Sequence, residues 1–291
     1  ANSYLGKSLA AYLAQWPEEF RVDSISVRDD AWKAADFHGY DAIYHTAALV
    51  HMEQDKQDPR QASLYDRVNA QLPIAIAEKA KAEGVGQFLF LSTAAVYGCT
   101  APFGKNVTIT ADTPIHPADN YGASKWKAEQ GLRALAEDGF HVAILRPPMI
   151  YGKGCKGNYR TLEAMARKLP CFPAVSNRRS MLYVGNLNEL VRLLLQSGEG
   201  GTFCPQNSEY VNTAQLVRQI AREHGRHVAL VPGCSWVLSL LRHMTPAVDK
   251  AFGSLCYDFA LSQYPQDYCL WDLPPPCGNP NTETERSLDP T

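Results

Sequence analysis

The sequence predicts an α/β fold in which a mostly parallel sheet is covered by helices. Four apolar runs of strand length, at residues 21–27, 42–45, 87–91 and 141–145, alternate with segments of helical period at 7–14, 59–83 and 121–138. Strands that alternate with helices need crossover connections, which leave neighbouring strands parallel. The third run, Phe88-Leu89-Phe90-Leu91, has no polar position, as is typical of a strand covered on both faces.

Length and composition exclude several classes of protein. The chain has 291 residues, a hydrophobic share of 45% and a net charge of -2, so it offers no basic field for nucleic acid and no apolar run long enough to cross a bilayer. Its eight cysteines are scattered without a CxxC pair, which favours reduced thiols. We therefore expect a cytoplasmic protein with no metal site, no nucleic-acid partner and no membrane partner.

A second, smaller lobe follows the alternating region. From Met149 onward glycine and proline become frequent, and helices are expected near 161–168, 187–195 and 213–224. We predict one domain over residues 1–148 and a second over 149–272. Residues 273–291 contain three consecutive prolines and few apolar side chains, so we expect a disordered tail there.

The first residues have the pattern of an anion-binding turn. Ser3, Tyr4 and Leu5 lead through Gly6 into a helical segment, and a helix N-terminus presents backbone N–H groups to a phosphate. Taken as the end of a dinucleotide fingerprint, this turn needs a glycine just before Ala1 and a central strand before that glycine. Because the chain starts with Ala and not Met, we expect that it begins inside a longer gene product. The alternative is an ordinary glycine near a helix start.

The end of the run at 21–27 is where such folds contact the adenosine ribose. A carboxylate there accepts from a 2′-hydroxyl, whereas an arginine accommodates a 2′-phosphate. Arg28 and Asp29 supply one of each. The pattern slightly favours NAD and leaves NADP open.

A phenol and an ammonium are paired at the start of the helical segment 121–138. Tyr121 and Lys125 are four residues apart and so share a helical face, where a cation lowers the pKa of a phenol and makes it a usable acid–base group. Ser92 and Thr93 follow the buried run at the carboxyl end of the sheet, where such folds bind ligands. The alternatives are a surface Tyr–Lys pair and, for Ser92, a hydroxyl that bonds the loop backbone.

Four segments in this order carry a resemblance to a known family: Thr46-Ala47-Ala48 after a strand, the run from Ser92 to Gly98, the run from Tyr121 to Lys125, and the run from Leu145 to Gly152. They resemble the extended short-chain dehydrogenases/reductases, in the NAD-dependent epimerase/dehydratase branch near UDP-glucose 4-epimerase. The resemblance covers residues 1 to about 225. It implies a Rossmann-type doubly wound parallel sheet with a smaller, mixed C-terminal substrate lobe, and a homodimer that binds NAD, or NADP, and a nucleotide sugar.

The resemblance also implies roles for individual residues. Thr93, Tyr121 and Lys125 correspond to the catalytic residues. The cofactor would be held by Ser3, Tyr4, Leu5, Arg28, Asp29, His45, Ala47, Ala48, Asn69, Ser92, Tyr121, Lys125, Pro148 and Met149, and the substrate by Thr93, Asn158 and Arg179. For Arg179 the alternative is a solvated surface pair with Arg178.

Two departures from the family pattern disfavour some of the reactions that members of this family carry out. Ala94 and Ala95 stand where dehydratases and decarboxylases of this branch carry acidic residues, and methyl groups cannot move protons. We therefore expect an epimerase in which Tyr121, made acidic by Lys125, exchanges a proton with a sugar hydroxyl. The alternatives are an NADPH-dependent reductase of a keto sugar or other carbonyl, and a non-catalytic cofactor-binding scaffold.

Overall fold

The protein is described by a computed structural model that covers residues 3–50, 59–155, 158–245 and 247–271. The described chain forms two compact units. Unit 1 draws on Ala1–Gly98, Pro114–Pro147 and Leu190–Cys204, and unit 2 on Cys99–Thr113, Pro148–Glu189 and Pro205–Thr291. The domain boundary predicted at residue 148 stays a prediction. In the structure, residues 99–113 also belong to unit 2 and residues 190–204 to unit 1, which the sequence did not indicate.

Unit 1 is built on a four-stranded parallel sheet. Its strands are β1 (Ala42–His45), β2 (Gln87–Leu91), β4 (His141–Leu145) and β8 (Gly201–Phe203), in the order β1-β2-β4-β8. Leu89 stands opposite Tyr44 in β1 and Ala143 in β4. The α/β prediction is confirmed, and the runs predicted at 42–45, 87–91 and 141–145 are strands.

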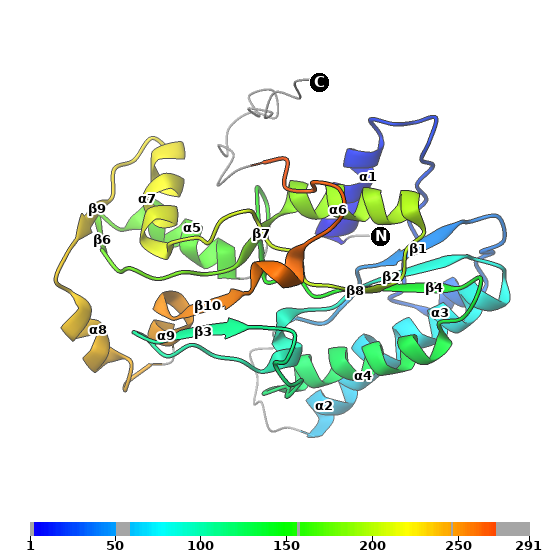
Figure 1. The fold of residues 1–291 in the computed structure, drawn as a ribbon, viewed down its shortest axis with the longest axis horizontal. Helices are drawn as coiled ribbons and strands as arrows, with labels where there is room; N and C mark the ends of the chain where they lie inside the picture. Colours follow the sequence, from blue (N-terminus) through cyan, green and yellow to red (C-terminus); the bar gives the residue numbers. More distant parts are fainter. Residues whose placement is uncertain (1–2, 51–58, 156–157, 246, 272–291) are drawn as a thin grey trace. The chain divides into compact units, whose positions relative to one another are not determined.

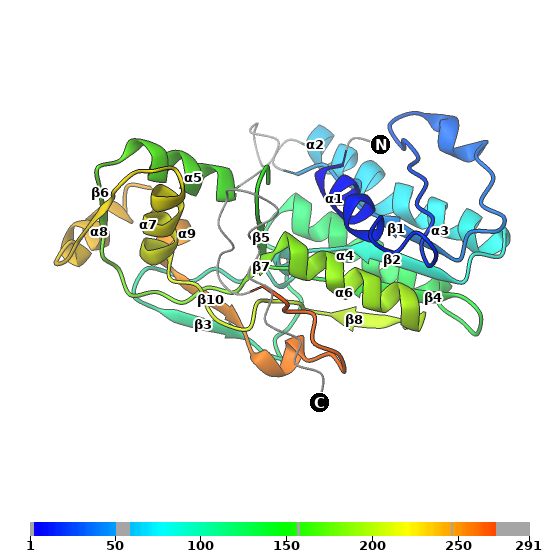
Figure 2. The ribbon, with the colours of Figure 1, turned by 90° about the horizontal axis from the view of Figure 1, so that it is seen from above.

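Helices cover both faces of this sheet. Figure 1 has α3 (Leu72–Ala82) and α4 (Asn120–Leu135) on one side of the strands, and α1 (Tyr4–Leu13) and the end of α6 (Val184–Ser197) on the other. The remaining helical elements of this unit are α2 (Pro59–Tyr65), a π-helical segment η2 (Asp66–Gln71), and two 3-10 helices, η1 (Asp30–Lys33) and η3 (Ala94–Tyr97). In the view of Figure 2, α1 and α6 lie in front of the strands.

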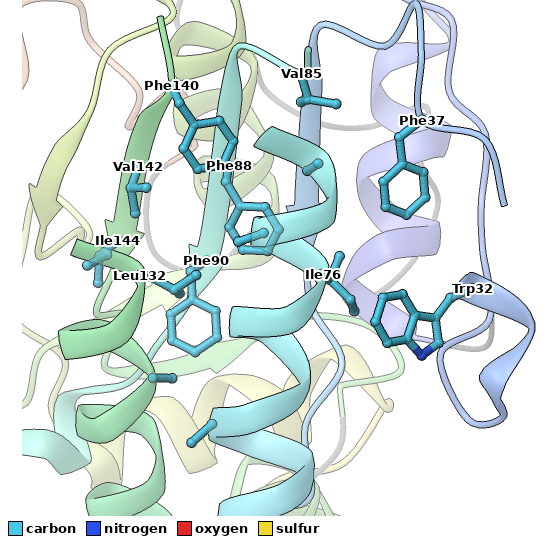
Figure 3. Packing of buried hydrophobic residues seen from close by; sticks show 14 residues of the cluster. Trp32, Phe37, Ile76, Val85, Phe88, Phe90, Leu132, Phe140, Val142 and Ile144 are labelled. Carbon is cyan, nitrogen blue, oxygen red and sulfur yellow. The ribbon is translucent and has the colours of Figure 1, made fainter. Parts of the chain in front are cut away.

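The core of unit 1 lies between the sheet and the helices α3 and α4. Phe88 and Phe90 of β2 are completely buried beside Val142 and Ile144 of β4 (Figure 3). Because side chains alternate across a strand, Gln87 and Leu89 face the other side, and the Gln87 amide donates to Leu194 O of α6 over 2.8 Å. Burial of a large apolar side chain contributes about 1.5–3 kcal/mol, so this core fixes the strand ends on which the site depends.

The strand predicted at 21–27 is not formed, which corrects the sequence analysis. The segment is irregular, and Val22 and Ile25 are exposed to 43% and 38%. A strand needs a partner edge, and among the described residues β1 pairs with β2 alone. Side chains hold the segment instead: the Tyr40 hydroxyl donates to Asp23 over 2.8 Å, and Val27 packs on the core.

Unit 2 consists of short parallel strand pairs and helices. The strands β3 (Asn106–Ile109) and β10 (Ser254–Tyr257) pair, as do β5 (Met149–Tyr151) with β7 (Met181–Tyr183) and β6 (Cys171–Pro173) with β9 (Ala229–Val231). Its helices are α5 (Asn158–Lys168), α7 (Thr213–Glu223), α8 (Ser235–Leu241), α9 (Ala247–Phe252) and the 3-10 helix η4 (Phe259–Ser262). The helices predicted near 161–168, 187–195 and 213–224 correspond to α5, α6 and α7.

Two further expectations concern the whole chain. The tail predicted at 273–291 lies outside the described residues. Seven cysteines of the described part form no disulfide bond with one another. Among the described helices, none has the length and apolar character needed to span a bilayer.

Gly98 ends η3 in a conformation that other residues rarely adopt. Its φ is 61°, in the left-handed region, and a Cβ built there would lie 1.9 Å from the carbonyl oxygen of His116. Glycine is therefore required at this position both for the backbone angle and for the space.

We predict that Gly98→Ala destabilises the protein by about 1–3 kcal/mol for the backbone angle and by about 1–3 kcal/mol more for the clash. Gly84→Ala is the matched control, because Gly84 has a φ of 82° but open space around its Cβ position. Urea unfolding measures both variants. Equal losses of stability would contradict the role assigned to the His116 contact.

Candidate active site

The first turn of α4 lies unusually close to the loop that follows β2. Asp119 caps the helix by accepting from the Gly122 N–H over 2.8 Å. A Cβ on Gly122 would stand only 2.6 Å from the carbonyl oxygen of Ala95, so the absence of a side chain lets the helix approach η3. This approach brings Tyr121 to Thr93.

Thr93 and Tyr121 form a hydroxyl pair at the carboxyl end of β2. Thr93 Oγ1 accepts from the Ala95 N–H over 3.2 Å, which caps η3, and its side chain is hydrogen-bonded to the Tyr121 phenol. The ring of Tyr65, at the end of α2, meets the Tyr121 ring edge-on with centroids 6.4 Å apart. The structure thus brings together two of the three residues predicted to be catalytic.

Lys125 lies one turn further along α4 and is almost completely buried, with 1% of its surface exposed. Its Nζ donates to the carbonyl oxygen of Leu91 over 2.8 Å and stands 4.4 Å from the centre of the Phe90 ring. Burial lowers the pKa of Lys125 to about 7, and the carboxylate of Glu129 acts against this shift.

The phenol of Tyr121 is less acidic than the sequence predicted. Burial raises its pKa to about 12, while the hydrogen bond with Thr93 acts in the opposite direction. The Lys125 ammonium bonds Leu91 O and lies over the Phe90 ring. That Lys125 makes the phenol acidic stays a prediction.

His45, predicted to touch a cofactor, has its side chain in the core. Its ring stacks between Phe88 and Phe90, at centroid distances of 6.2 and 6.1 Å. Burial first, and the charge of Lys125 second, lower its pKa to about 3, so the imidazole is neutral. Its Nε2 is buried with no hydrogen-bond partner among the described residues.

Asn69 connects the loop after β1 to the catalytic helix. It is completely buried within the π-helical segment η2, an irregularity that is frequent at functional sites. Its amide accepts from the Leu49 N–H over 2.8 Å and donates to Leu49 O over 3.1 Å and to Ser124 Oγ over 3.2 Å. Asn69 therefore holds Ala47, Ala48 and Leu49 in place.

The N-terminus of α1 has the features of an anion site. Ser3 caps the helix by accepting from the Gly6 N–H over 3.3 Å, and it also accepts from Thr46 Oγ1 over 2.9 Å. The first turn, which includes Tyr4 and Leu5, contains no acidic residue. The Thr46 contact, which the sequence analysis did not predict, ties this turn to the end of β1.

Ser92 belongs to a buried ionic cluster that the sequence analysis missed. Its hydroxyl donates to Glu129 of α4 over 2.5 Å, and the same carboxylate is paired with Arg146 over 2.6 Å. The serine hydroxyl is therefore directed at Glu129, although the sequence had suggested a cofactor contact. The signal that could have revealed the cluster is the continued four-residue spacing of Tyr121, Lys125 and Glu129.

The residues predicted to read the adenosine ribose lie in the irregular segment. Asp29 accepts from the Ala31 N–H over 3.2 Å and caps η1, and the Arg28 N–H bonds Ser26. No strand is formed over 21–27, so neither side chain stands at a strand end, and their contact with the ribose stays a prediction.

Several predicted residues belong to unit 2. Pro148 and Met149 begin its second segment, Pro148–Glu189, and Asn158 begins α5, although its side chain lies outside the described part. Arg179 is half-buried and exchanges backbone hydrogen bonds with Val211; burial lowers the pKa of its guanidinium. Their roles stay predictions.

One cluster of side chains has the composition of a metal site, but its members already bond one another or neighbouring groups. Asp36, His38 and Glu83 gather their ligand atoms within 4.8 Å. The Asp36 carboxylate bonds His38 Nδ1 over 2.6 Å, and Glu83 is paired with Lys79 and accepts from the Phe37 N–H. These contacts anchor the loop before β1 to α3.

Sequence comparisons relate this chain to a protein family and to individual proteins. The sequence profile described as "NAD dependent epimerase/dehydratase family" matches residues 5–204. UDP-glucose 4-epimerase of Vibrio cholerae is 30% identical over 227 residues, which are 75% of this chain and 68% of that protein. The N-acetyl-alpha-D-glucosaminyl-diphospho-ditrans,octacis-undecaprenol 4-epimerase of Escherichia coli O157:H7 is 29% identical over 209 residues, 69% of this chain and 60% of that protein.

Solved structures resemble the chain in fold. The dTDP-4-dehydrorhamnose reductase of Bacillus anthracis, in complex with NADP, superposes with a TM-score of 0.63 at 21% identity, over 79% of this chain and 80% of that one. MoeE5 in complex with UDP-glucose and NAD superposes with a TM-score of 0.60 at 18% identity, over 91% and 88%.

We predict that Asn69→Ala destabilises the protein by about 1–3 kcal/mol, because it removes the partner of both polar groups of Leu49. Gln71→Ala is the control, since Gln71 lies in the same π-helical segment but makes an exposed bond to Asp66. Urea unfolding and hydrogen exchange of the Leu49 amide measure the effect. If the Leu49 amide exchanged at the same rate in both variants, Asn69 would not be the residue that holds Leu49.

We also predict a pH dependence of stability that belongs to Lys125. The folded-state pKa of about 7 lies below the ordinary lysine value of about 10.4, so the unfolded chain binds the extra proton between these values. The neutral Lys125 amine therefore contributes to the free energy of unfolding at high pH. This contribution is lost as the pH falls toward 7. The free energy of unfolding of the wild type, minus that of Lys125→Met, should therefore rise by on the order of 1–3 kcal/mol from pH 7 to 10.

Lys127→Met is the control for this measurement. Lys127 is the second residue after Lys125 on α4, but its side chain is 58% exposed and paired with Asp66. Its difference from the wild type should be flat over the same range. A Lys125→Met difference that falls with rising pH would overturn the assignment.

Proposed function

Because this chain belongs to the NAD dependent epimerase/dehydratase family, we propose that it is a nucleotide-sugar epimerase that binds NAD and uses Tyr121 as its acid–base group. The observation that carries this proposal is the Thr93–Tyr121 hydroxyl pair at the carboxyl end of a parallel strand, with Lys125 buried one turn away. UDP-glucose is the substrate that similarity to the Vibrio cholerae enzyme favours.

The residues of unit 1 fit a dinucleotide. A capped helix N-terminus without acidic residues suits a pyrophosphate, and Ser3, Tyr4 and Leu5 would supply its contacts. The loop of Ala47 and Ala48, fixed by Asn69, would lie along the cofactor, and the Lys125 ammonium would meet ribose hydroxyls. Bound NAD would accept a hydride from the sugar and return it.

Tyr121 would supply proton transfer at the sugar oxygen. When a sugar hydroxyl is oxidised, the Tyr121 phenolate would take its proton, and the Thr93 hydrogen bond favours that charged form although burial raises the pKa of the phenol to about 12. When the ketone is reduced again, the phenol would return this proton to the sugar oxygen. The two halves cancel, so epimerisation consumes no net proton or electron pair.

Thr93 is flanked by groups that favour epimerisation over elimination. Ala94 and Ala95 form the first turn of η3 and offer only methyl groups beside the hydroxyl pair. A dehydratase needs a further acid or base at the reacting carbon, and these two positions cannot supply one.

A reductase of a keto sugar that uses NADPH is the second candidate. Arg28 is the cation that a 2′-phosphate would need, but the strand whose end would place it is not formed. The likeness in fold to a reductase with bound NADP supports the same reading. Both candidates share Thr93, Tyr121 and Lys125. A cytoplasmic homodimer, with pairing through 59–83 and α4, stays a prediction.

The proposal predicts that Tyr121→Phe lowers the rate of UDP-glucose epimerisation by about 10²–10⁴-fold or more, while NAD binding is kept. Interconversion of the two sugars is followed by chromatography and NAD binding by quenching of protein fluorescence. Tyr40→Phe is the control, because Tyr40 bonds Asp23 outside the site. Full activity of Tyr121→Phe would remove the assignment.

The net consumption of reduced cofactor distinguishes the proposed epimerase from the proposed reductase. An epimerase interconverts its sugars with no net change in NADH absorbance, whereas a reductase oxidises one NADPH for each carbonyl reduced. Stoichiometric NADPH oxidation with a keto sugar, and no sugar interconversion, would replace the epimerase by the reductase.

A further inference from the structure

Glu129 is a completely buried carboxylate that continues the row of Tyr121 and Lys125 on α4. A buried charge is stable only when it is paired and hydrogen-bonded. Glu129 has three such partners: Ser92 Oγ donates over 2.5 Å, Arg146 Nη2 over 2.6 Å and Arg133 Nη2 over 2.9 Å.

Two of these partners stand at the ends of neighbouring strands. Ser92 follows β2 and Arg146 follows β4, and the Ser92 N–H also donates to Leu145 O over 2.7 Å. Arg146 additionally bonds the Tyr97 hydroxyl over 2.8 Å at the end of η3. The carboxylate therefore fastens α4 to the strand end that continues into Thr93.

The same carboxylate favours the charged form of Lys125. The Lys125 Nζ bonds Leu91 O, so the ammonium and the carboxylate are anchored on consecutive residues, Leu91 and Ser92. In the described part of the chain, the Phe90 ring of β2 lies by the ammonium, and His45 of β1 interacts with it electrostatically. Neither carries a negative charge.

Stability alone is a weak reason for such a cluster. Replacing a buried ion pair by well-packed apolar residues is often neutral or stabilising. The free energy of folding therefore gives only a weak explanation of the pair, and its position behind the acid–base residues suggests a second one.

We propose that Glu129 is a positioning residue of the acid–base site: its charge keeps Lys125 protonated, and its hydrogen bonds hold the strand end that carries Thr93. The catalytic consequence rests on the function proposed above. The effect on Lys125 belongs to this chain by itself and is measurable without cofactor or substrate.

The test is Glu129→Gln, which keeps the shape of the side chain and removes its charge. The titration of Lys125 is followed in the cofactor-free protein through its 13Cε NMR signal, assigned by its loss in Lys125→Met. We expect the midpoint to fall below that of the wild type. In Glu129→Asp, which keeps the charge, the midpoint should stay closer to the wild-type value.

Glu83→Gln is the control for this experiment. Glu83 is a half-buried carboxylate of the same unit, paired with Lys79 on α3, and its loss should leave the Lys125 midpoint unchanged. In the presence of NAD and UDP-glucose, Glu129→Gln should lower kcat by about 10²-fold and move the alkaline limb of the pH profile to lower pH, because the ammonium is lost earlier.

A second variant covers the case in which Glu129→Gln does not fold, since Arg146 would then be a buried charge without its main partner. Glu129→Met combined with Arg146→Met removes both charges and should also lower the Lys125 midpoint. An unchanged midpoint in a folded variant of either kind overturns the proposal. A wild type that converts no nucleotide sugar overturns the proposed function, while the NMR titration still decides the role of Glu129.

Discussion

The close packing of α4 against the end of β2 is the constraint on which the site depends. Gly122 leaves no room for a Cβ against Ala95, and the small residues Ser124 and Ala128 continue the buried face. At four-residue spacing, Tyr121, Lys125 and Glu129 then all face the sheet. A larger residue at 122 would move the helix away and separate Tyr121 from Thr93, although every functional side chain would still be present.

Burial on this face favours the uncharged forms of the acid–base groups. It raises the pKa of Tyr121 to about 12 and lowers the pKa of Lys125 to about 7, so the neutral phenol and the neutral amine are both favoured by desolvation. Two interactions oppose this effect of burial: the Thr93 hydrogen bond favours the Tyr121 phenolate, and the charge of Glu129 favours the Lys125 ammonium. The charged state needed for proton exchange is therefore supported by specific neighbours rather than by the helix spacing alone.

The sequence predicted what local patterns determine. The unbroken apolar run of β2 and the runs of β1 and β4 became strands because each has a pairing neighbour and helices to cover it. The run at 21–27 mixes apolar and polar residues but has no partner strand in the described part of the chain, and pairing with a partner is not a local property. In the same way, four-residue spacing predicted that Tyr121 and Lys125 share a face, but it could not predict that the ammonium bonds Leu91. The Glu129–Arg146 pair was missed because its members are brought together by the sheet, from the helix and from the end of a neighbouring strand.

The arrangement around Thr93 also limits the chemistry that this site can perform. Glu129 is the buried carboxylate of the ionic cluster, but it already accepts from Ser92, Arg146 and Arg133, and proton uptake would leave Arg146 without its counter-charge in a buried place. It is therefore a poor second acid. With alanines at 94 and 95, the Thr93–Tyr121 pair itself can move one proton to and from one oxygen. Reversible oxidation of a hydroxyl needs no more than that, whereas an elimination needs a second proton-transfer group at the neighbouring carbon. This balance of groups, rather than similarity to any single relative, is the physical reason to favour epimerisation over dehydration.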